Sequence, residues 1–109
     1  MSYTSVKTFH DVVHDFGMDL TFCMNTYPTV ALTADFGIGQ IVDPATGAAA
    51  TASSEQFIIL LTNAKAGQEE VCGVDQHCVI SEAALEAEAD VIAAAKEFHI
   101  ARNAGVRFK

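Results

Sequence analysis

The sequence predicts an α+β fold, in which an N-terminal and a C-terminal helix pack on one face of an antiparallel sheet of four or five strands. Apolar residues recur at helical spacing near both ends of the chain, and they alternate with polar residues in the stretches between. Half of the 109 residues are hydrophobic, which suits a single globular domain over residues 1–109. An all-α bundle is the alternative, if residues 28–37 and 54–66 are helical.

The first expected element is an amphipathic helix over Ser5–Phe16. Ser5 is a suitable N-cap residue, and Gly17 stops the pattern. The apolar residues between them share one helical face. They are Val6, Phe9, Val13 and Phe16.

Strands are expected next, because the hydrophobic period changes to two. Alternation runs through "DLTFCMN" and "TVALTADFGI", and Pro28 lies between them, where it suits a turn or a sheet edge. The stretch "IVDPATGAA" then predicts a hairpin built on a type I turn, with Gly47 at a position of positive φ.

The stretch "SSEQFIILLTNAKAGQ" fits two structures. As a helix it would begin with a capping box of Ser53 and Gln56 and end at Gly67. As a strand, Phe57–Thr62 would be central and buried on both faces. The short run and its aromatic and β-branched residues favour the strand.

A helix capped by Ser81 is expected over "EAALEAEADVIAAAKEFHIARNAG". Its acidic residues come first and its basic residues last, the order that the helix dipole favours. The closing "VRFK" predicts a frayed end, or a short strand or arm that docks on a partner or a second subunit.

The formal net charge of −8 argues against partners that carry phosphate. Nucleic-acid binding needs clustered cations, and docking on anionic membranes needs them too, so neither partner is expected. The most apolar run, Phe57–Leu61, is far shorter than the roughly 20 residues of a membrane-spanning helix. Three cysteines and no visible secretory signal predict a reduced, cytoplasmic protein.

The stretch "CGVDQHC" raises the question of a metal site, because Cys72, His77 and Cys78 lie close together in it. On a straight strand the two cysteines would stand about 20 Å apart, at about 3.3 Å per residue, which is too far for one tetrahedral zinc. His10 and His14 have the i, i+4 spacing of a shared metal, but no zincin pattern surrounds them. We expect no structural zinc and no cofactor, with the cysteines packing as small core residues.

Signals for catalysis are weak. "FGIGQ" holds a lone G-x-G, and Cys23 has no basic neighbour that would lower its pKa. No complete active site can be assembled from the residues, so a non-enzymatic protein is expected.

The function expected from the sequence is that of a small acidic interaction or adaptor protein acting as a homodimer, because an alanine-rich helical stripe lets another backbone approach closely. The residues assigned to a dimer or partner interface are Ala84, Ala87, Val91, Ala94, Phe98, Ala101 and Phe108. Phe98→Ala is expected to destabilise the protein more than any single change in "CGVDQHC".

In the order of its elements the chain resembles the class I secretion chaperones: a first helix running into "DFGMDLTF", a meander and a C-terminal amphipathic helix. The resemblance implies a dimer that holds unfolded protein segments, and it rests on no motif. Two alternatives stay open: a small ligand- or metal-binding domain using His10, His14, Cys72 and His77, and an accessory protein of a phage or mobile element that mimics nucleic acid.

Overall fold

The computed structural model describes residues 13–15, 24–75, 78–102 and 105–109. Within them it contains short strands, one 3-10 turn and one α-helix. In chain order the elements are β1 (Val13–Asp15), β2 (Met24–Pro28), β3 (Ile41–Asp43), β4 (Ala48–Ala49), β5 (Ile58–Ile59), β6 (Glu70–Val74), β7 (Cys78–Ile80), η1 (Glu82–Ala84), α3 (Ala89–Ala101) and β8 (Val106–Phe108).

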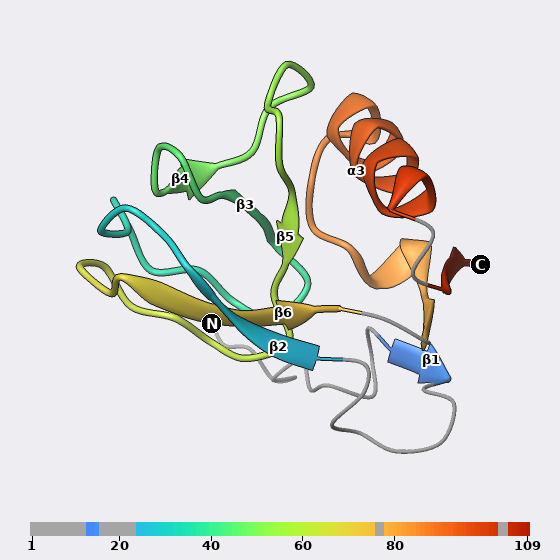
Figure 1. Ribbon diagram of the computed structural model, residues 1–109, viewed down its shortest axis with the longest axis horizontal. Coiled ribbons are helices and arrows are strands. Elements are labelled where there is room, and N and C mark those ends of the chain that lie inside the picture. The colour runs from blue at the N-terminus through green and yellow to red at the C-terminus, as the bar shows by residue number, and fades with distance from the viewer. Residues whose placement is uncertain (1–12, 16–23, 76–77, 103–104) are drawn as a thin grey trace.

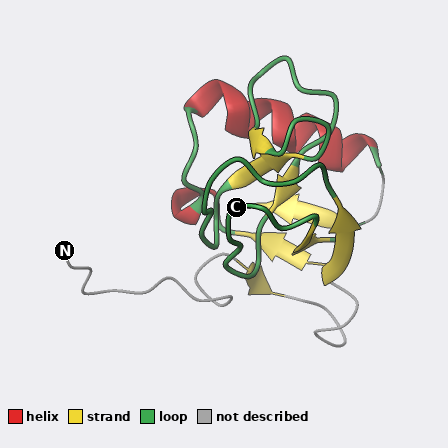
Figure 2. Ribbon diagram, turned by 90° about the vertical axis from the view of Figure 1, so that its left-hand side faces the viewer, coloured by secondary structure: helices red, strands yellow, loops and turns green. Residues whose placement is uncertain are grey.

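The strands form three small sheets, with orders β1-β7-β8, β2-β6 and β4-β3-β5. All pairs are antiparallel except β7 with β8, which is parallel. A bridge between Leu60 and Gly73 connects the β5 segment to β6. The helix α3 lies along one side of these strands (Figures 1 and 2). The mixed helix-and-strand architecture agrees with the sequence, but three small sheets replace the single sheet of four or five strands.

The strand predicted over Phe57–Thr62 is confirmed in its centre, where Ile58–Ile59 form β5 and Leu60 bridges Gly73, whereas Thr62 is exposed. The side chains of residues 57–61 alternate between two core clusters: Phe57, Ile59 and Leu61 belong to the cluster beneath α3, whereas Ile58 and Leu60 belong to a second one. None of the five is more than 6% exposed. The alternation of a strand therefore fills both cores from one short segment.

The predicted hairpin is confirmed. β3 pairs antiparallel with β4, and the Asp43 carbonyl accepts hydrogen bonds from the N–H groups of Thr46 and Gly47. Gly47 has φ of 72°, and a Cβ there would meet the carbonyl oxygens of Val30 and Ala31. Glycine is required at this position for its backbone conformation and for the close approach of a neighbouring segment.

The predicted helix over Ser5–Phe16 is wrong where the structure describes it. Val13–Asp15 form β1, paired with β7, and the rest of that range lies outside the described residues. The apolar residues have helical spacing, but this segment joins a sheet because β7 supplies hydrogen-bond partners for its backbone. The local spacing of apolar residues contains no information about such a distant partner.

Residues 29–38 do not form the predicted strand. Leu32 and Phe36, four positions apart, are buried, whereas Val30 is 54% exposed, so the two-residue period fails. The segment is held by separate backbone bonds: the Leu32 N–H donates to the Gln68 carbonyl, and Phe36 bridges Ala64. These contacts are too widely spaced to make a continuous ladder.

The C-terminal helix is confirmed, but it begins at Ala89 rather than just after Ser81. Ser81 caps the 3-10 turn η1 instead, without a side-chain hydrogen bond. The expected strand in "VRFK" is β8, which pairs with β7 of the same chain rather than with a partner.

Candidate functional site

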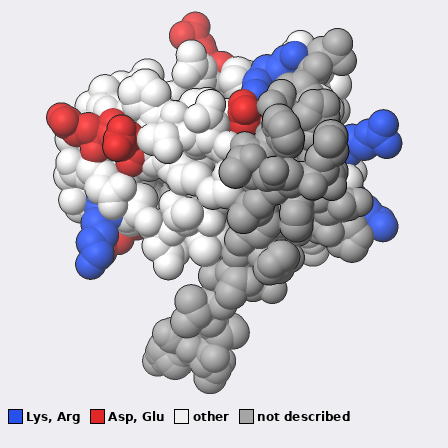
Figure 3. All heavy atoms as spheres, turned by 60° about the horizontal axis from the view of Figure 1, so that its bottom comes forward, with Lys and Arg blue, Asp and Glu red and all other residues white. Residues whose placement is uncertain are grey.

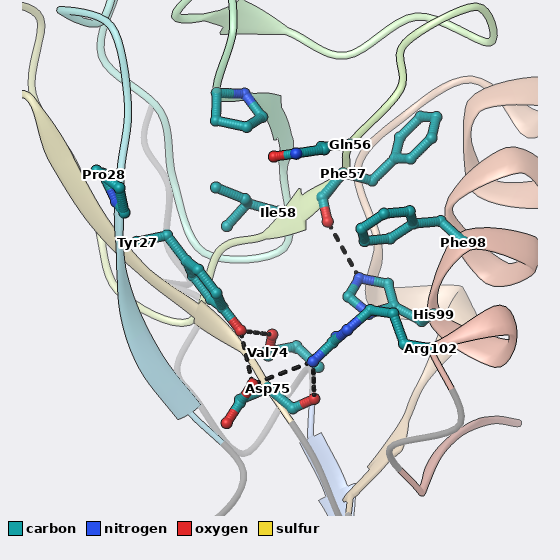
Figure 4. A pocket seen from close by; sticks show the side chains of 11 residues that line it. Tyr27, Pro28, Gln56, Phe57, Ile58, Val74, Asp75, Phe98, His99 and Arg102 are labelled. Carbon is teal, nitrogen blue, oxygen red and sulfur yellow. Dashed lines mark hydrogen bonds and ion pairs between the residues drawn. The ribbon is translucent and has the colours of Figure 1, made fainter.

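A cavity of about 180 Å³ lies between α3 and the strands β2, β5 and β6 (Figure 4). We call it the Arg102 pocket. Its lining residues are Tyr27, Pro28, Pro44, Gln56, Phe57, Ile58, Val74, Asp75, Phe98, His99 and Arg102. Aromatic rings, prolines and aliphatic side chains make up most of its wall, and a small group of polar side chains converges on one side.

The polar side chains come from three separate elements. Tyr27 lies on β2, and Asp75 follows the last residue of β6. Tyr27 pairs with Val71, whereas Asp75 follows Val74 at the other end of β6, so the Tyr27 side chain runs along the sheet to reach Asp75. His99 lies on α3, and Arg102 is the C-cap residue of this helix three positions later, a spacing that places two side chains on neighbouring parts of a helix surface.

His99 is held in one tautomer by its two hydrogen bonds. Its Nε2 lies 3.1 Å from the Phe57 carbonyl oxygen, which only accepts, so Nε2 carries the hydrogen. Its Nδ1 then accepts from Arg102 Nη1 at 2.7 Å. The residue is 2% exposed, and burial, helped by the Arg102 charge, lowers the pKa of His99 to about 4. His99 is therefore neutral at pH 7.

Arg102 connects the helix to the strands. Its Nη2 donates to the Asp75 backbone oxygen at 2.8 Å and to Asp75 Oδ1 at 3.1 Å. The single hydrogen of the Tyr27 hydroxyl is shared between the same Oδ1, at 2.9 Å, and the Val74 carbonyl oxygen, at 3.1 Å. Burial, the hydrogen bond to Asp75 and the charge of Asp75 raise the pKa of the Tyr27 hydroxyl, so it is a neutral donor.

This arrangement suits binding better than catalysis. Both ring nitrogens of His99 are bonded, and the charges of Arg102 and Asp75 are paired with each other. A catalytic base needs a free, positioned atom whose pKa is near the working pH. What the pocket offers is a rigid, mostly apolar concavity with one planar guanidinium held in place.

Arg102→Ala is expected to lower the free energy of unfolding by about 2 kcal/mol, because it leaves His99 Nδ1 and the Asp75 carboxylate without their shared donor. Urea unfolding monitored by circular dichroism measures the change. Arg107 on β8 is exposed and supplies the matched control, since Arg107→Ala should change stability by no more than about 0.5 kcal/mol. Equal losses in the two variants would mean that the Arg102 hydrogen bonds contribute nothing.

The predicted metal residues are only partly described. His10 and His77 lie outside the described residues, and of His14 and Cys78 the structure gives the backbone, in β1 and β7. Cys72 lies on β6, half-buried, and burial raises the pKa of its thiol. Among the described residues no group of three or more His, Cys, Asp or Glu side chains could hold a metal ion.

The single strand assumed for "CGVDQHC" is wrong. β6 ends at Val74 and β7 begins at Cys78, and the two strands belong to different sheets. The separation of about 20 Å that followed from a straight strand therefore does not apply to Cys72 and Cys78.

The residues predicted for an interface lie mostly against this chain's own core. Val91 is buried in the cluster beneath α3, and Ala101 is exposed. The other members are partly buried and pack against that cluster. They are Ala84, Ala87, Ala94, Phe98 and Phe108. Their assignment to a dimer or partner interface stays a prediction.

The polar group of the pocket was not predicted from the sequence, although one signal for it was present. Val91, Ala95 and His99 recur every fourth residue and are the buried residues of α3. A buried stripe predicted along these three residues, rather than along Val91, Ala94 and Phe98, would have placed His99 in the core. No comparable signal links Tyr27 to Asp75, because a contact 48 residues apart depends on the pairing of β2 with β6.

Comparisons with protein-family models, curated proteins and solved structures found no match to this chain. Within the described part of the chain, no helix has both the length and the hydrophobicity needed to cross a bilayer.

Proposed function

We propose that this protein is a non-enzymatic interaction module that holds a partner protein by one aromatic side chain inserted in the Arg102 pocket. The observation that carries the proposal is the pocket itself: a small cavity with aromatic and proline walls whose converging polar groups are already bonded to one another. The expected cytoplasmic location belongs to the same proposal.

The volume of the pocket favours a single ring. Sites for drug-sized ligands measure roughly 300–1,000 Å³, whereas a cavity of about 150 Å³ is enough for benzene. At about 180 Å³ the Arg102 pocket matches one side chain rather than a nucleotide or another large cofactor. Larger hollows of about 400–530 Å³ occur elsewhere, but no buried polar side chain lines them.

The chemistry of the wall favours an aromatic side chain. The rings of Phe57 and Phe98 lie 5.8 Å apart with planes tilted by 58°, an arrangement that a third ring can extend. The Arg102 guanidinium is fixed by bonds to His99 and Asp75, and a planar cation of this kind stacks well on aromatic faces. Buried aromatic anchors in such pockets supply most of the energy of many protein interfaces.

An NMR titration with N-acetyl-phenylalaninamide tests the proposal. The phenylalanine ring should cause saturable chemical-shift changes at Tyr27, Phe57 and Val74. The dissociation constant should be about 1 mM, because a single anchoring side chain binds without the rest of the protein interface. N-acetyl-alaninamide, which has the same backbone and no ring, should cause none. Shifts that are absent, or equal for the two compounds, would contradict the proposal.

Two tryptophan variants supply a matched control. Gln56 is exposed and lines the pocket, so Gln56→Trp should cover the opening and abolish the shifts. Glu55 is exposed beside it and does not line the pocket, so Glu55→Trp should leave binding unchanged. Binding that survives in Gln56→Trp would place the ring elsewhere.

The alternative of nucleic-acid mimicry would need carboxylates in a continuous array. On the face drawn in Figure 3, the Asp and Glu side chains stand in separate groups, with wide uncharged areas between them. Uncharged surface of this extent favours a protein partner instead. The metal-binding alternative depends on His10, His14 and His77, whose side chains lie outside what the structure describes.

A further inference from the structure

The face of α3 that points away from the core carries an apolar hollow. It has a volume of about 530 Å³, and its helix residues include Ala89, Ala93, Lys96 and Ile100. Ile100 is 60% exposed and, with Val30, is one of the two large hydrophobic side chains exposed among the described residues. The helix therefore presents a protruding side chain and a hollow on one face.

The spacing of these residues is that of a helix-pairing seam. Ala89, Ala93, Lys96 and Ile100 follow one another at intervals of four, three and four positions, so they lie along one side of α3. Seams with this spacing pack against another helix, and small residues in them allow the two backbones to come close.

The seam is complementary to itself when two copies of α3 run antiparallel. Consider a two-fold axis that passes between Lys96 and Glu97. Ile100 follows Lys96 by four positions and Ala93 precedes Glu97 by four, so Ile100 of each copy faces Ala93 of the other. The same axis sets Lys96 of each copy opposite Glu97 of the other.

The charges support this arrangement. Glu97 is exposed, and the Lys96 ammonium lies 3.0 Å from Glu82 of its own chain at the edge of the hollow. An ammonium has three hydrogens to donate, so Lys96 can bond Glu82 and also meet a carboxylate of a second copy. A two-fold axis makes each such contact twice, as in most homodimers.

We infer that the outward face of α3, formed by Ala89, Ala93, Lys96, Glu97 and Ile100, is a homodimer interface that takes a second copy of this chain in antiparallel orientation. None of these interface residues lines the Arg102 pocket, so a second copy bound here leaves that pocket free. It is a different set of residues from the stripe that the sequence predicts for a dimer or partner interface.

Sedimentation equilibrium across the micromolar range tests this interface, with circular dichroism to verify folding of each variant. The wild type is expected to be a dimer. Ile100→Glu should raise the dissociation constant about tenfold or more, because it places a carboxylate against Ala93 of the other copy, where no partner compensates its loss of water. Val30→Glu is the matched control: Val30 is similarly exposed, at 54%, but lies outside α3, so this variant should remain dimeric.

Glu97→Lys supplies a second, independent readout. It should also raise the dissociation constant about tenfold, because lysines would then face one another across the axis. Glu69→Lys, an equal change in charge at an exposed position away from α3, should not. A monomeric wild type, or a dimer unaffected by Ile100→Glu and Glu97→Lys, would overturn the inference. Gln56→Trp should leave the dimer intact, so failure of the pocket proposal is separable from failure of this one.

Discussion

Gly73→Ala is expected to destabilise the protein by about 3 kcal/mol, a large part of the roughly 5–15 kcal/mol that holds a domain folded. Gly73 is buried in β6, between Asn25 on one side and Leu60 on the other. A Cβ there would lie 2.5 Å from Ile58 Cγ2 and 2.9 Å from the Ile59 carbonyl oxygen. Real side chains do not approach so closely, so β5 or β6 must move.

Gly37→Ala is the control. A Cβ at Gly37 would meet its nearest atoms, Asn63 Oδ1 and Gln40 Oε1, at 3.6 and 3.8 Å, which is ordinary contact. The free energy of unfolding of this variant should lie within about 0.5 kcal/mol of that of the wild type. Urea melts of both variants measure the difference, and a Gly73→Ala protein as stable as Gly37→Ala would show that β5 and β6 are not packed as described.

This expectation revises one that the sequence suggested. Phe98→Ala was expected to exceed every single change in "CGVDQHC", but Phe98 is only partly buried. Its truncation should cost less than the roughly 3–5 kcal/mol typical of a fully buried phenylalanine. Gly73 is the more sensitive position because two strands meet over it, a contact that periodicity alone does not reveal.

The protein is expected to lose about 3 kcal/mol of stability as the pH falls from 6.5 to 4, through His99 alone. The pKa of His99 is lowered to about 4 in the folded protein, chiefly by burial, against 6.5 when exposed. Between these values the unfolded chain binds a proton that the folded protein excludes, so acid favours unfolding. Above pH 6.5 both states are neutral and the effect vanishes. Each unit of pKa corresponds to about 1.4 kcal/mol.

His99→Gln isolates this effect. A glutamine amide can donate to the Phe57 carbonyl and accept from Arg102, as the imidazole does, but it does not titrate. Urea unfolding at several pH values should show a steeper loss in the wild type than in His99→Gln, with the remaining carboxylates and histidines common to both. Identical pH profiles would mean that the pKa of His99 is the same in the folded and the unfolded protein.

The sequence predicted the elements whose signal is local. The "DPATG" turn fixes the β3–β4 hairpin through Asp43 and Gly47, and Phe57–Leu61 is extended as its composition indicates. The C-terminal helix also follows from its pattern, although it starts at Ala89 because residues 85–88 leave the helical path. Residues 13–15 and 29–38 could not be predicted, since their conformations depend on β7 and on residues 64–69.

The polar group of the Arg102 pocket could not be predicted from the sequence for the same reason. Tyr27, Asp75 and Arg102 carry no motif and lie far apart in the chain. They converge because β2 pairs with β6 and because α3 turns its His99 face toward β5. Only the last of these steps has a periodic signal, which is the four-residue recurrence of Val91, Ala95 and His99.

The long reach of these contacts has a consequence for biosynthesis. Tyr27 bonds a residue 48 positions later, and Phe57 one 42 positions later. Such non-local contacts must first overcome the entropy of closing long loops, and domains that depend on them fold in milliseconds to seconds. The ribosome makes α3 after the strands that it covers, so the apolar side chains of Ile59 and Leu61 stay uncovered until then. A nascent chain in that state is prone to aggregation and is a natural client for general chaperones.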